Sequence, residues 1–362
     1  MSAEIYSHAP GPRRSDEQGR VAARRSTPRT LQTSRNSIPL EECDMSLRAL
    51  GRSLSDEFTT LQKLGAGTFG SVSKVRLHGG DETFALKLLS FDTAEEQTYV
   101  KREVQCLRDV NHPHVVRIVD AFSLGPDRAG ILMEYVETNV EYWLSTLPDG
   151  PVPKQQMTNF GLQLFSGLEA LHERSILHRD IKPANFLFDR AAEIVKIGDL
   201  GNARRSSPQA IEYTRKLGSL WYRPPELLLG AKLYGPEVDT WAAGCVMWEL
   251  IASEPAFPGQ SEITMLHHIF RLLGTPSAER WAGLTTLPFF SAKFPKWHGR
   301  LADQIFRHDP SVGEACVTFF QRVLSGSPDL RLRAADACTH EFLAPSGRAP
   351  KRTKTNAAVA GT

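Results

Sequence analysis

The spacing of apolar residues changes along the chain and separates a strand-rich beginning from a helix-rich remainder. Between Phe58 and Leu89, apolar and polar residues alternate, and the alternation is broken at Gly65–Gly70 and at Gly79–Gly80. Alternation with period two, interrupted by glycines, predicts strands joined by tight turns. The first part of the folded chain is therefore expected to be a small β-sheet.

A helical period replaces the alternation from about Asp92. Thr93 and Glu96 have the spacing of a capping box, and the apolar positions that follow fall on one side of a helix. Beyond Gly150 the helical period dominates, in the ranges Met157–His172, Val238–Ile251 and Ile263–Leu273. The pattern predicts an α+β fold with a small β-rich lobe that carries one main helix, followed by a larger and mainly helical lobe.

The two ends of the chain differ from this pattern. Residues 1–55 are rich in Ser, Arg, Pro and Gln and have no sustained apolar period, which predicts a disordered arm. Residues 343–362 are basic and contain no acidic residue. The tails are candidate localisation or docking segments, or equally solvated segments without a function. The predicted domain lies between them, over residues 58–342, and is divided into 58–136 and 137–342.

Composition limits the classes of partner. The chain has 43 basic and 41 acidic residues, so its net charge of +2 creates no strong field towards nucleic acid or a membrane. Its 5 cysteines are widely spaced and show no zinc-ligand spacing. No apolar run approaches the roughly 20 residues that span a bilayer, and the N-terminus lacks a signal-peptide pattern. We expect a soluble intracellular protein of the nucleus or cytoplasm, without a direct nucleic-acid or membrane partner.

A glycine-rich segment occupies the first predicted turn. Its residues are Leu64, Gly65, Ala66, Gly67, Thr68, Phe69, Gly70, Ser71 and Val72. Glycines at this spacing allow backbone N–H groups to approach phosphate oxygens. A dinucleotide site would require a helix after the glycines, whereas Val72–Leu77 alternates as a strand does. Taken alone, the glycines are equally compatible with a plain hairpin.

Lys87 stands at the end of an apolar strand. An ammonium group is costly there unless it meets an anion or a carboxylate. Glu103, on the predicted helix, is the candidate partner, and Lys87 is then a candidate for binding the α- and β-phosphates of ATP. Each residue alone is more often a surface charge, so the order of glycine loop, lysine and helical glutamate carries the prediction.

The segment His178-Arg179-Asp180-Ile181-Lys182-Pro183-Ala184-Asn185 resembles the catalytic loop of eukaryotic protein kinases. By this resemblance Asp180 orients the substrate hydroxyl and accepts its proton, Lys182 stabilises the transferring phosphoryl group, and Asn185 binds magnesium. Asp199 precedes Leu200-Gly201 and is the second implied magnesium ligand. The resemblance therefore implies ATP and Mg²⁺, and the lysine two residues after Asp180 is typical of Ser/Thr kinases.

The same resemblance implies further residues around the nucleotide and the catalytic loop. Ala85 and Leu187 would sandwich the adenine, and Glu134 and Val136 would offer it backbone hydrogen bonds. Glu226, in Trp-Tyr-Arg-Pro-Pro-Glu, is expected to pair with Arg331, and Asp239 is expected to brace the catalytic-loop backbone.

Other segments resemble the cyclin-dependent kinases more narrowly. They are Trp221–Arg223, Gly244–Met247, Phe257–Gly259 and Leu273–Pro276. The resemblance extends from about Phe58 to Phe342 and implies protein substrates with Ser-Pro or Thr-Pro sites. In this family an arginine, here Arg223, hydrogen-bonds the carbonyl oxygen of a strained residue, here Gly218. A substrate N–H at that point would therefore lack an acceptor, whereas proline has no N–H to leave unpaired.

Thr214 stands where these kinases carry an activating phosphothreonine, and Arg102, Arg179 and Arg204 are its expected phosphate pocket. The alternative is that these arginines pair with ordinary surface carboxylates. The predicted helix keeps Arg102-Glu103 but lacks the rest of the cyclin-contacting signature, so the need for a cyclin or another activating subunit stays open.

Two other functions compete with catalysis. A pseudokinase or scaffold would bind partners through the same fold, but such proteins usually lack at least one catalytic residue. This chain retains Lys87, Glu103, Asp180, Asn185 and Asp199. A dinucleotide-binding oxidoreductase has no use for the segment from Asp180 to Asn185, so an active kinase is the preferred prediction.

Overall fold

The computed structural model describes residues 48–49, 53–67, 70–148, 150–206 and 219–344. These residues form two compact units. The first contains the described residues up to Gln105 together with Arg117–Val136, and the second contains Cys106–Val116 and the described residues from Glu137 onwards. Most of the predicted arm and the basic tail lie outside the described residues, as do Thr68, Phe69, Thr214 and Gly218.

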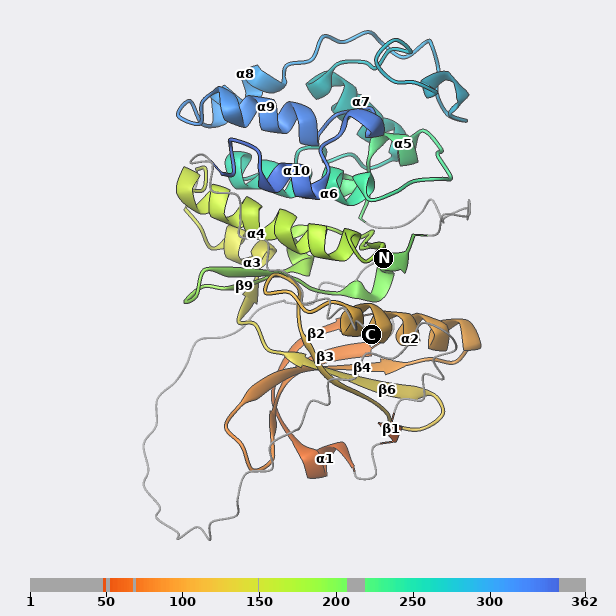
Figure 1. Cartoon of the computed structure of the whole chain (residues 1–362), viewed down its shortest axis with the longest axis vertical. Helices are drawn as coiled ribbons and strands as arrows, with labels where there is room; N and C mark the ends of the chain where they lie inside the picture. The colour runs from red at the N-terminus through yellow and green to blue at the C-terminus, as the bar shows by residue number, and fades with distance from the viewer. Residues whose placement is uncertain (1–47, 50–52, 68–69, 149, 207–218, 345–362) are drawn as a thin grey trace, which may run out of the picture. The chain divides into compact units, whose positions relative to one another are not determined.

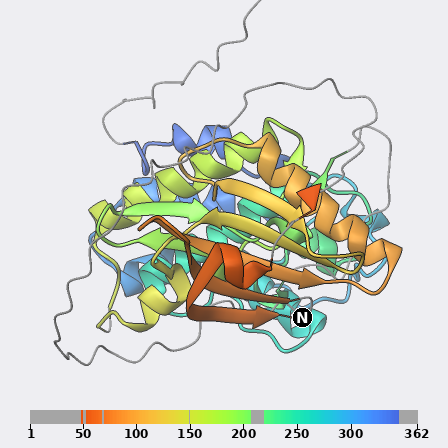
Figure 2. The ribbon, with the colours of Figure 1, turned by 90° about the horizontal axis from the view of Figure 1, so that it is seen from below.

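The first unit is built on a six-stranded sheet with the strand order β1-β5-β6-β4-β3-β2. The strands are β1 (Arg48–Ala49), β2 (Phe58–Gly67), β3 (Gly70–Leu77), β4 (Thr83–Ser90), β5 (Ile118–Ser123) and β6 (Arg128–Glu134). Every neighbouring pair is antiparallel except β1 and β5. The strands lie side by side with the usual twist (Figure 2). The alternation predicted from Phe58 to Leu89 is confirmed as β2, β3 and β4.

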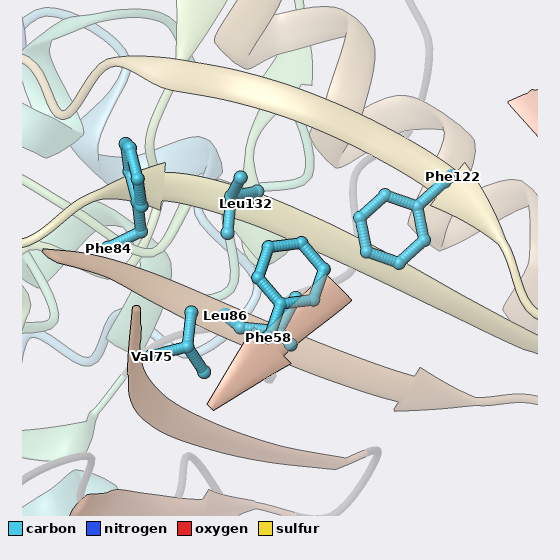
Figure 3. Packing of buried hydrophobic residues seen from close by; sticks show 6 residues of the cluster. All are labelled: Phe58, Val75, Phe84, Leu86, Phe122 and Leu132. Atoms are coloured by element: carbon cyan, nitrogen blue, oxygen red, sulfur yellow. The ribbon is translucent and has the colours of Figure 1, made fainter. Parts of the chain in front are cut away.

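One face of this sheet is covered by an apolar cluster (Figure 3). Its buried members are Phe58, Val75, Phe84, Leu86, Phe122 and Leu132. The rings of Phe58 and Phe122 stack, with centroids 6.2 Å apart. The short helix α1 (Leu54–Glu57) leads into β2 and places Leu54 against the cluster. The burial of these side chains fixes which face of each strand points inwards.

Helix α2 (Ala94–Asp109) begins with the capping box that the sequence predicted. The Glu96 N–H donates to the Thr93 hydroxyl at 3.2 Å. In return the Glu96 carboxylate accepts the N–H groups of Asp92 and Thr93 at 2.8 and 3.2 Å. These bonds satisfy backbone donors that the helix itself leaves unpaired. They set the start of the helix, and therefore the position of Glu103 along it.

The second unit is mainly helical (Figure 1). Its helices are α3 (Val140–Ser145), α4 (Lys154–His172), α5 (Pro225–Leu228), α6 (Glu237–Ala252), α7 (Glu262–Leu273), α8 (Leu301–His308), α9 (Glu314–Val323) and α10 (Ala334–Cys338). Short sheets join β7 (Thr138–Asn139), β9 (Phe186–Asp189) and β10 (Ile194–Ile197), and join β8 (Ile176–Leu177) with β11 (Arg204–Arg205). Five 3₁₀ turns complete the described elements: η1 (Pro183–Asn185), η2 (Leu200–Asn202), η3 (Leu220–Tyr222), η4 (Leu284–Thr286) and η5 (Pro328–Leu330).

Helix α6 is the central element of this unit, because every residue from Val238 to Ile251 is buried. Helix α4 contacts both α6 and α10 (Figure 1). The three long helices predicted beyond Gly150 are confirmed as α4, α6 and α7. None of the helices in the described ranges combines the length and apolarity that a membrane crossing requires.

Candidate active site

The glycine-rich segment of the first unit joins β2 and β3. Gly65 pairs with Val72, and Gly67 pairs with Gly70, so the chain reverses between positions 67 and 70. A Cβ atom on Gly70 would lie 1.8 Å from the Leu88 carbonyl oxygen, which leaves room only for glycine. The chain continues as a strand after Gly70, so the helix that a dinucleotide site requires is absent from the described residues that follow.

A small apolar cluster lies beside this hairpin in the same unit. Leu64, Val72 and Ala85 are buried together, and Met133 and Tyr135 pack against them. Two bonds connect Glu134 to the start of β5: its N–H donates to the Arg117 carbonyl at 3.0 Å, and its carboxylate accepts the Arg117 N–H at 2.7 Å. Of the residues expected around adenine, Ala85 belongs to this cluster, and Leu64 and Val72 join it from the glycine-rich segment. Leu187 lies on β9 of the second unit.

Lys87 on β4 and Glu103 on α2 form a short ion pair. Nζ lies 2.6 Å from Oε1, and the two side chains are 14% and 5% exposed. A carboxylate this deeply buried requires a charged or hydrogen-bonding partner. The capping box of α2 and the register of β4 bring the two residues together. The geometry therefore holds the Lys87 ammonium group at a fixed position. The strand does not end at Lys87 as the sequence predicted, because the pairing of β4 (Thr83–Ser90) with β6 continues to Ser90.

Asp180 is the carboxylate of the segment His178–Asn185, called the catalytic segment below, and is 2% exposed. Its Oδ1 accepts the Ser219 N–H at 3.0 Å and lies 3.4 Å from the Ser219 hydroxyl. Its Oδ2 lies 3.2 Å from Asn185 Nδ2, 3.4 Å from Asn202 Nδ2 and 3.6 Å from Lys182 Nζ. Donors from three separate segments thus fix the orientation of one carboxylate.

Asp239 on α6 holds the backbone of the catalytic segment. Its two carboxylate oxygens accept the N–H groups of His178 and Arg179, each at 2.8 Å, and Oδ2 also lies 3.0 Å from His172 Nε2. Burial by itself raises the pKa of Asp239, but these hydrogen bonds and the nearby imidazoles outweigh it and hold the pKa below its ordinary value. The bracing predicted from the sequence is confirmed.

Asn185 and Asp199, the two expected magnesium ligands, both lie in the second unit. The Asn185 amide nitrogen donates to the Asp180 carbonyl at 2.7 Å, which leaves the amide oxygen as the free end of the group. Asp199 has left-handed backbone dihedrals, with φ of 52°. A carboxylate and an amide oxygen are hard donors of the kind that magnesium shares with phosphates. The described residues contain no cluster of three His, Cys, Asp or Glu side chains that would form a cage around a metal.

The segment Trp221–Glu226 is anchored to the core of the second unit. Arg331 donates to both oxygens of Glu226, at 2.7 and 2.9 Å, and its side chain is 0% exposed. This confirms the buried ion pair predicted from the sequence. Close by in the chain, Arg223 Nη1 lies 3.0 Å from Glu262 Oε1, and Trp221 Nε1 donates to the Gly259 carbonyl at 3.1 Å. Both contacts join the segment to the start of α7.

The three arginines of the expected phosphate pocket belong to different elements. Arg179 donates to the Asn202 carbonyl at 2.9 Å, and Arg204 lies on β11. Arg102 is in the first unit, where its guanidinium lies over the Tyr99 ring at 5.1 Å. Because Thr214 lies outside the described residues, the phosphate pocket stays a prediction.

Two neighbours of Asp180 were not predicted from the sequence. Ser219 lies just before the Trp-Tyr-Arg segment, and Asn202 follows the Asp-Leu-Gly segment by one residue. Both reach Asp180 from elsewhere in the chain, Ser219 from 39 residues away. Their positions next to the Trp-Tyr-Arg and Asp-Leu-Gly segments could have suggested that they lie near Asp180. A serine or an asparagine does not by itself indicate such a contact.

Comparisons with known proteins agree with this geometry. The family model described as "Protein kinase domain" matches residues 58–343. The chain is also 34% identical over 293 residues to "Cyclin-dependent kinase 1" of Encephalitozoon cuniculi (strain GB-M1), which covers 80% of this chain and 97% of that protein. The expected α+β kinase fold is confirmed. The chain therefore belongs to the protein kinase family and is a cyclin-dependent kinase-like serine/threonine protein kinase.

Proposed function

We propose that this chain transfers the γ-phosphoryl group of ATP to a serine or threonine hydroxyl that is followed by proline, with Asp180 as the proton acceptor. The observation that carries the proposal is the environment of Asp180. A carboxylate that is 2% exposed is oriented by donors from Ser219, Asn185 and Asn202. Such fixed orientation is what a catalytic base requires, because geometry precedes pKa in general-base catalysis.

In the proposed reaction the substrate oxygen attacks the γ-phosphorus, the bond to the β-phosphate oxygen breaks, and the hydroxyl proton passes to Asp180. ADP is the leaving group. Lys182, whose Nζ lies 3.6 Å from Asp180 Oδ2, places a positive charge beside the base and the transferring group. Asn185 and Asp199 would hold magnesium, which supplies charge neutralisation for the phosphates when it is bound.

The first unit supplies most of the proposed nucleotide contacts. The hairpin at Gly65–Gly70 offers backbone N–H groups, and its glycines permit a close approach to phosphate. Lys87, held by Glu103, is proposed to bind the α- and β-phosphates. Leu64, Val72 and Ala85 present an apolar surface for adenine, and Leu187 is proposed to cover the opposite face of the base. Glu134 and Val136 would bind the edge of the base through their backbones.

The preference for proline is proposed on the basis of Arg223. Its side chain is 9% exposed and one of its nitrogens lies 3.0 Å from a Glu262 carboxylate oxygen, which restricts the position of the guanidinium. In the kinases that this chain resembles, this arginine hydrogen-bonds the carbonyl oxygen of the residue that corresponds to Gly218. A substrate amide at that point would lose its hydrogen bond, which costs about 1–3 kcal/mol. Proline avoids the loss, and Gly218 tolerates the unusual backbone.

Control by phosphorylation of Thr214 is part of the proposal. A phosphate there would add nearly two negative charges and draw Arg102, Arg179 and Arg204 towards it. Addition of a cyclin or another protein subunit to the assay decides whether such a subunit is also needed for activation.

The test is transfer of labelled phosphate from ATP with magnesium to a Ser-Pro peptide and to a matched Ser-Ala peptide, with Asp180→Asn as the blank. We expect transfer to Ser-Pro that exceeds transfer to Ser-Ala at least about tenfold, in line with the cost of one lost hydrogen bond. Equal transfer would remove the proline preference and keep the kinase. Nucleotide binding without transfer, in protein that carries phosphate on Thr214 and after a cyclin has been added, would instead favour the pseudokinase.

A further inference from the structure

A recess in the second unit lies between α7, α8 and the end of α6, and the proposed catalytic residues do not line it. Its volume is about 220 Å³. Its polar lining consists of Glu254, His268, Arg271, Arg300, Gln304 and His308, and Trp248 contributes an aromatic wall. Two arginines and two histidines therefore share one recess with a single carboxylate.

The fold places the two arginines on neighbouring segments. Arg271 is in the last turn of α7. The Arg300 N–H donates to the Leu272 carbonyl at 2.7 Å, which ties the start of α8 to the end of α7. This approach requires glycine at 299, because a Cβ atom there would lie 2.6 Å from the Leu273 carbonyl oxygen. The adjacency of the two segments that carry these arginines is thus set by backbone packing.

The charges of the recess are not balanced. Among the residues that the structure describes, no carboxylate forms an ion pair with Arg271 or Arg300. The carboxylate of Glu254 lies 3.9 Å from His308 Nε2, and the His308 ring packs edge-on against Trp248 with centroids 5.7 Å apart. Burial, together with the positive charges of Arg271 and His267, lowers the pKa of His268. Arg271 and Arg300 therefore offer the recess two positive charges that no carboxylate of the described residues pairs with, which favours the binding of an anion there.

We propose that this recess binds the phosphoryl group of a phosphorylated serine or threonine in a protein that docks on the kinase. A guanidinium presents its N–H groups as a planar fork that matches phosphate oxygens, and two forks on adjacent segments hold one phosphoryl group from two sides. The Gln304 amide supplies a further donor. Glu254 repels an anion from the His308 side, so the phosphoryl group is expected beside Arg271 and Arg300.

The size of the recess favours a single group over a whole ligand. Sites that enclose a small molecule have volumes of about 300–1,000 Å³, above the 220 Å³ found here. Arg271 and Arg300 are exposed, so a phosphorylated side chain could reach them while its own backbone stays on the surface. A docked phosphoprotein would be held away from the catalytic residues, which leaves the active site available for a second serine or threonine of the same protein.

The test is fluorescence anisotropy with the full chain in the absence of nucleotide. Two labelled peptides are compared, one with phosphoserine and the other with serine at the same position, and in both this residue is followed by alanine. The phosphopeptide should bind at least about tenfold more tightly. The glutamine variants Arg271→Gln and Arg300→Gln should each weaken phosphopeptide binding about tenfold. The lysine variants Arg271→Lys and Arg300→Lys should weaken it by less, because lysine keeps the charge but lacks the planar guanidinium fork. Added salt should weaken the binding.

The control substitution is Arg307→Gln, which removes an exposed arginine of α8 outside the recess and should leave phosphopeptide binding unchanged. Transfer to an unphosphorylated Ser-Pro peptide should be equal in all these variants, which reports that the catalytic unit is intact. Equal binding of the two peptides, or phosphopeptide binding that survives the Arg271→Gln/Arg300→Gln double substitution, would overturn the proposal. Displacement by inorganic phosphate as effective as displacement by the phosphopeptide would mean an adventitious ion only.

Discussion

Arg331 and Glu226 form a two-pronged ion pair although 105 positions separate them in the chain. The guanidinium also donates to the Glu237 carbonyl at 2.9 Å and to the Ser325 carbonyl at 3.1 Å, and it lies over the Trp241 ring at 5.0 Å. One arginine therefore joins the segment Trp221–Glu226, the start of the central helix α6 and the turn before η5.

Replacing one partner of this pair should destabilise the second unit strongly. Arg331→Met leaves the Glu226 carboxylate buried without a counter-charge, and we expect a loss of about 3–5 kcal/mol in the free energy of unfolding. Urea denaturation followed by circular dichroism measures this loss. The matched control is Arg322→Met on α9, where the arginine is exposed, and its effect should stay within about 0.5 kcal/mol. A loss of the same small size at Arg331 would contradict the structural role of the pair.

Lys87→Met should abolish phosphate transfer while the protein remains folded. The substitution removes the ammonium group proposed for the phosphates and takes one charged partner away from the buried Glu103 carboxylate. Steady-state phosphorylation of the Ser-Pro peptide measures the effect, and thermal unfolding shows whether the fold survives. Lys74→Met, on the neighbouring strand β3, serves as the control because its ammonium group instead lies over the Tyr135 ring at 4.0 Å. Activity of Lys87→Met near that of the control would remove Lys87 from the mechanism.

The buried carboxyl group of Glu249 should make the free energy of unfolding decrease as the pH rises. Burial raises the pKa of this carboxyl from 4.5 to about 7, and the negative charge of Glu141 adds to the rise, whereas the hydrogen bond to Tyr222 opposes it. Because the folded state binds this proton more tightly than the unfolded state, the stabilisation is complete below about pH 4.5 and is lost as the pH passes through about 7.

The test of this carboxyl is Glu249→Gln, which keeps the shape and an acceptor oxygen but cannot ionise. The variant should gain up to about 3 kcal/mol relative to the parent at pH 8, and much less at pH 5. Urea unfolding at the two pH values provides the comparison, with the exposed Glu279→Gln as the control. A difference between Glu249→Gln and the parent that does not depend on pH would mean that Glu249 does not titrate in this range.

Gly130 on β6 should not tolerate a side chain. A Cβ atom there would lie 2.4 Å from the Phe122 ring, which is fully buried in the cluster of the first unit. Gly130→Ala is therefore expected to cost about 1–3 kcal/mol through overpacking. At Gly80 nothing lies within 4 Å of the added atom, so Gly80→Ala should be close to neutral. Equal melting temperatures for the two variants would show that Phe122 moves aside at no cost.

Local chemistry was sufficient to predict the elements and several contacts. Period-two alternation identified β2, β3 and β4, and the spacing of Thr93 and Glu96 identified the start of α2. The catalytic segment was recognisable because its polar residues lie within eight consecutive positions. These features depend on neighbours in the chain, and a linear sequence records such neighbours directly.

The environment of Asp180 and the recess at Arg271 and Arg300 were decided by the tertiary structure. Ser219 and Asn202 reach Asp180 only because the chain folds back on itself, and Gly299 brings Arg300 beside the end of α7. No local period or propensity encodes these contacts, since each depends on how buried helices and backbone carbonyls pack. The sequence alone therefore determined the family, the elements and the residue types of the site. The packing of the core determined which distant side chains surround the Asp180 carboxylate. It also determined where two arginines lie without a carboxylate partner among the described residues.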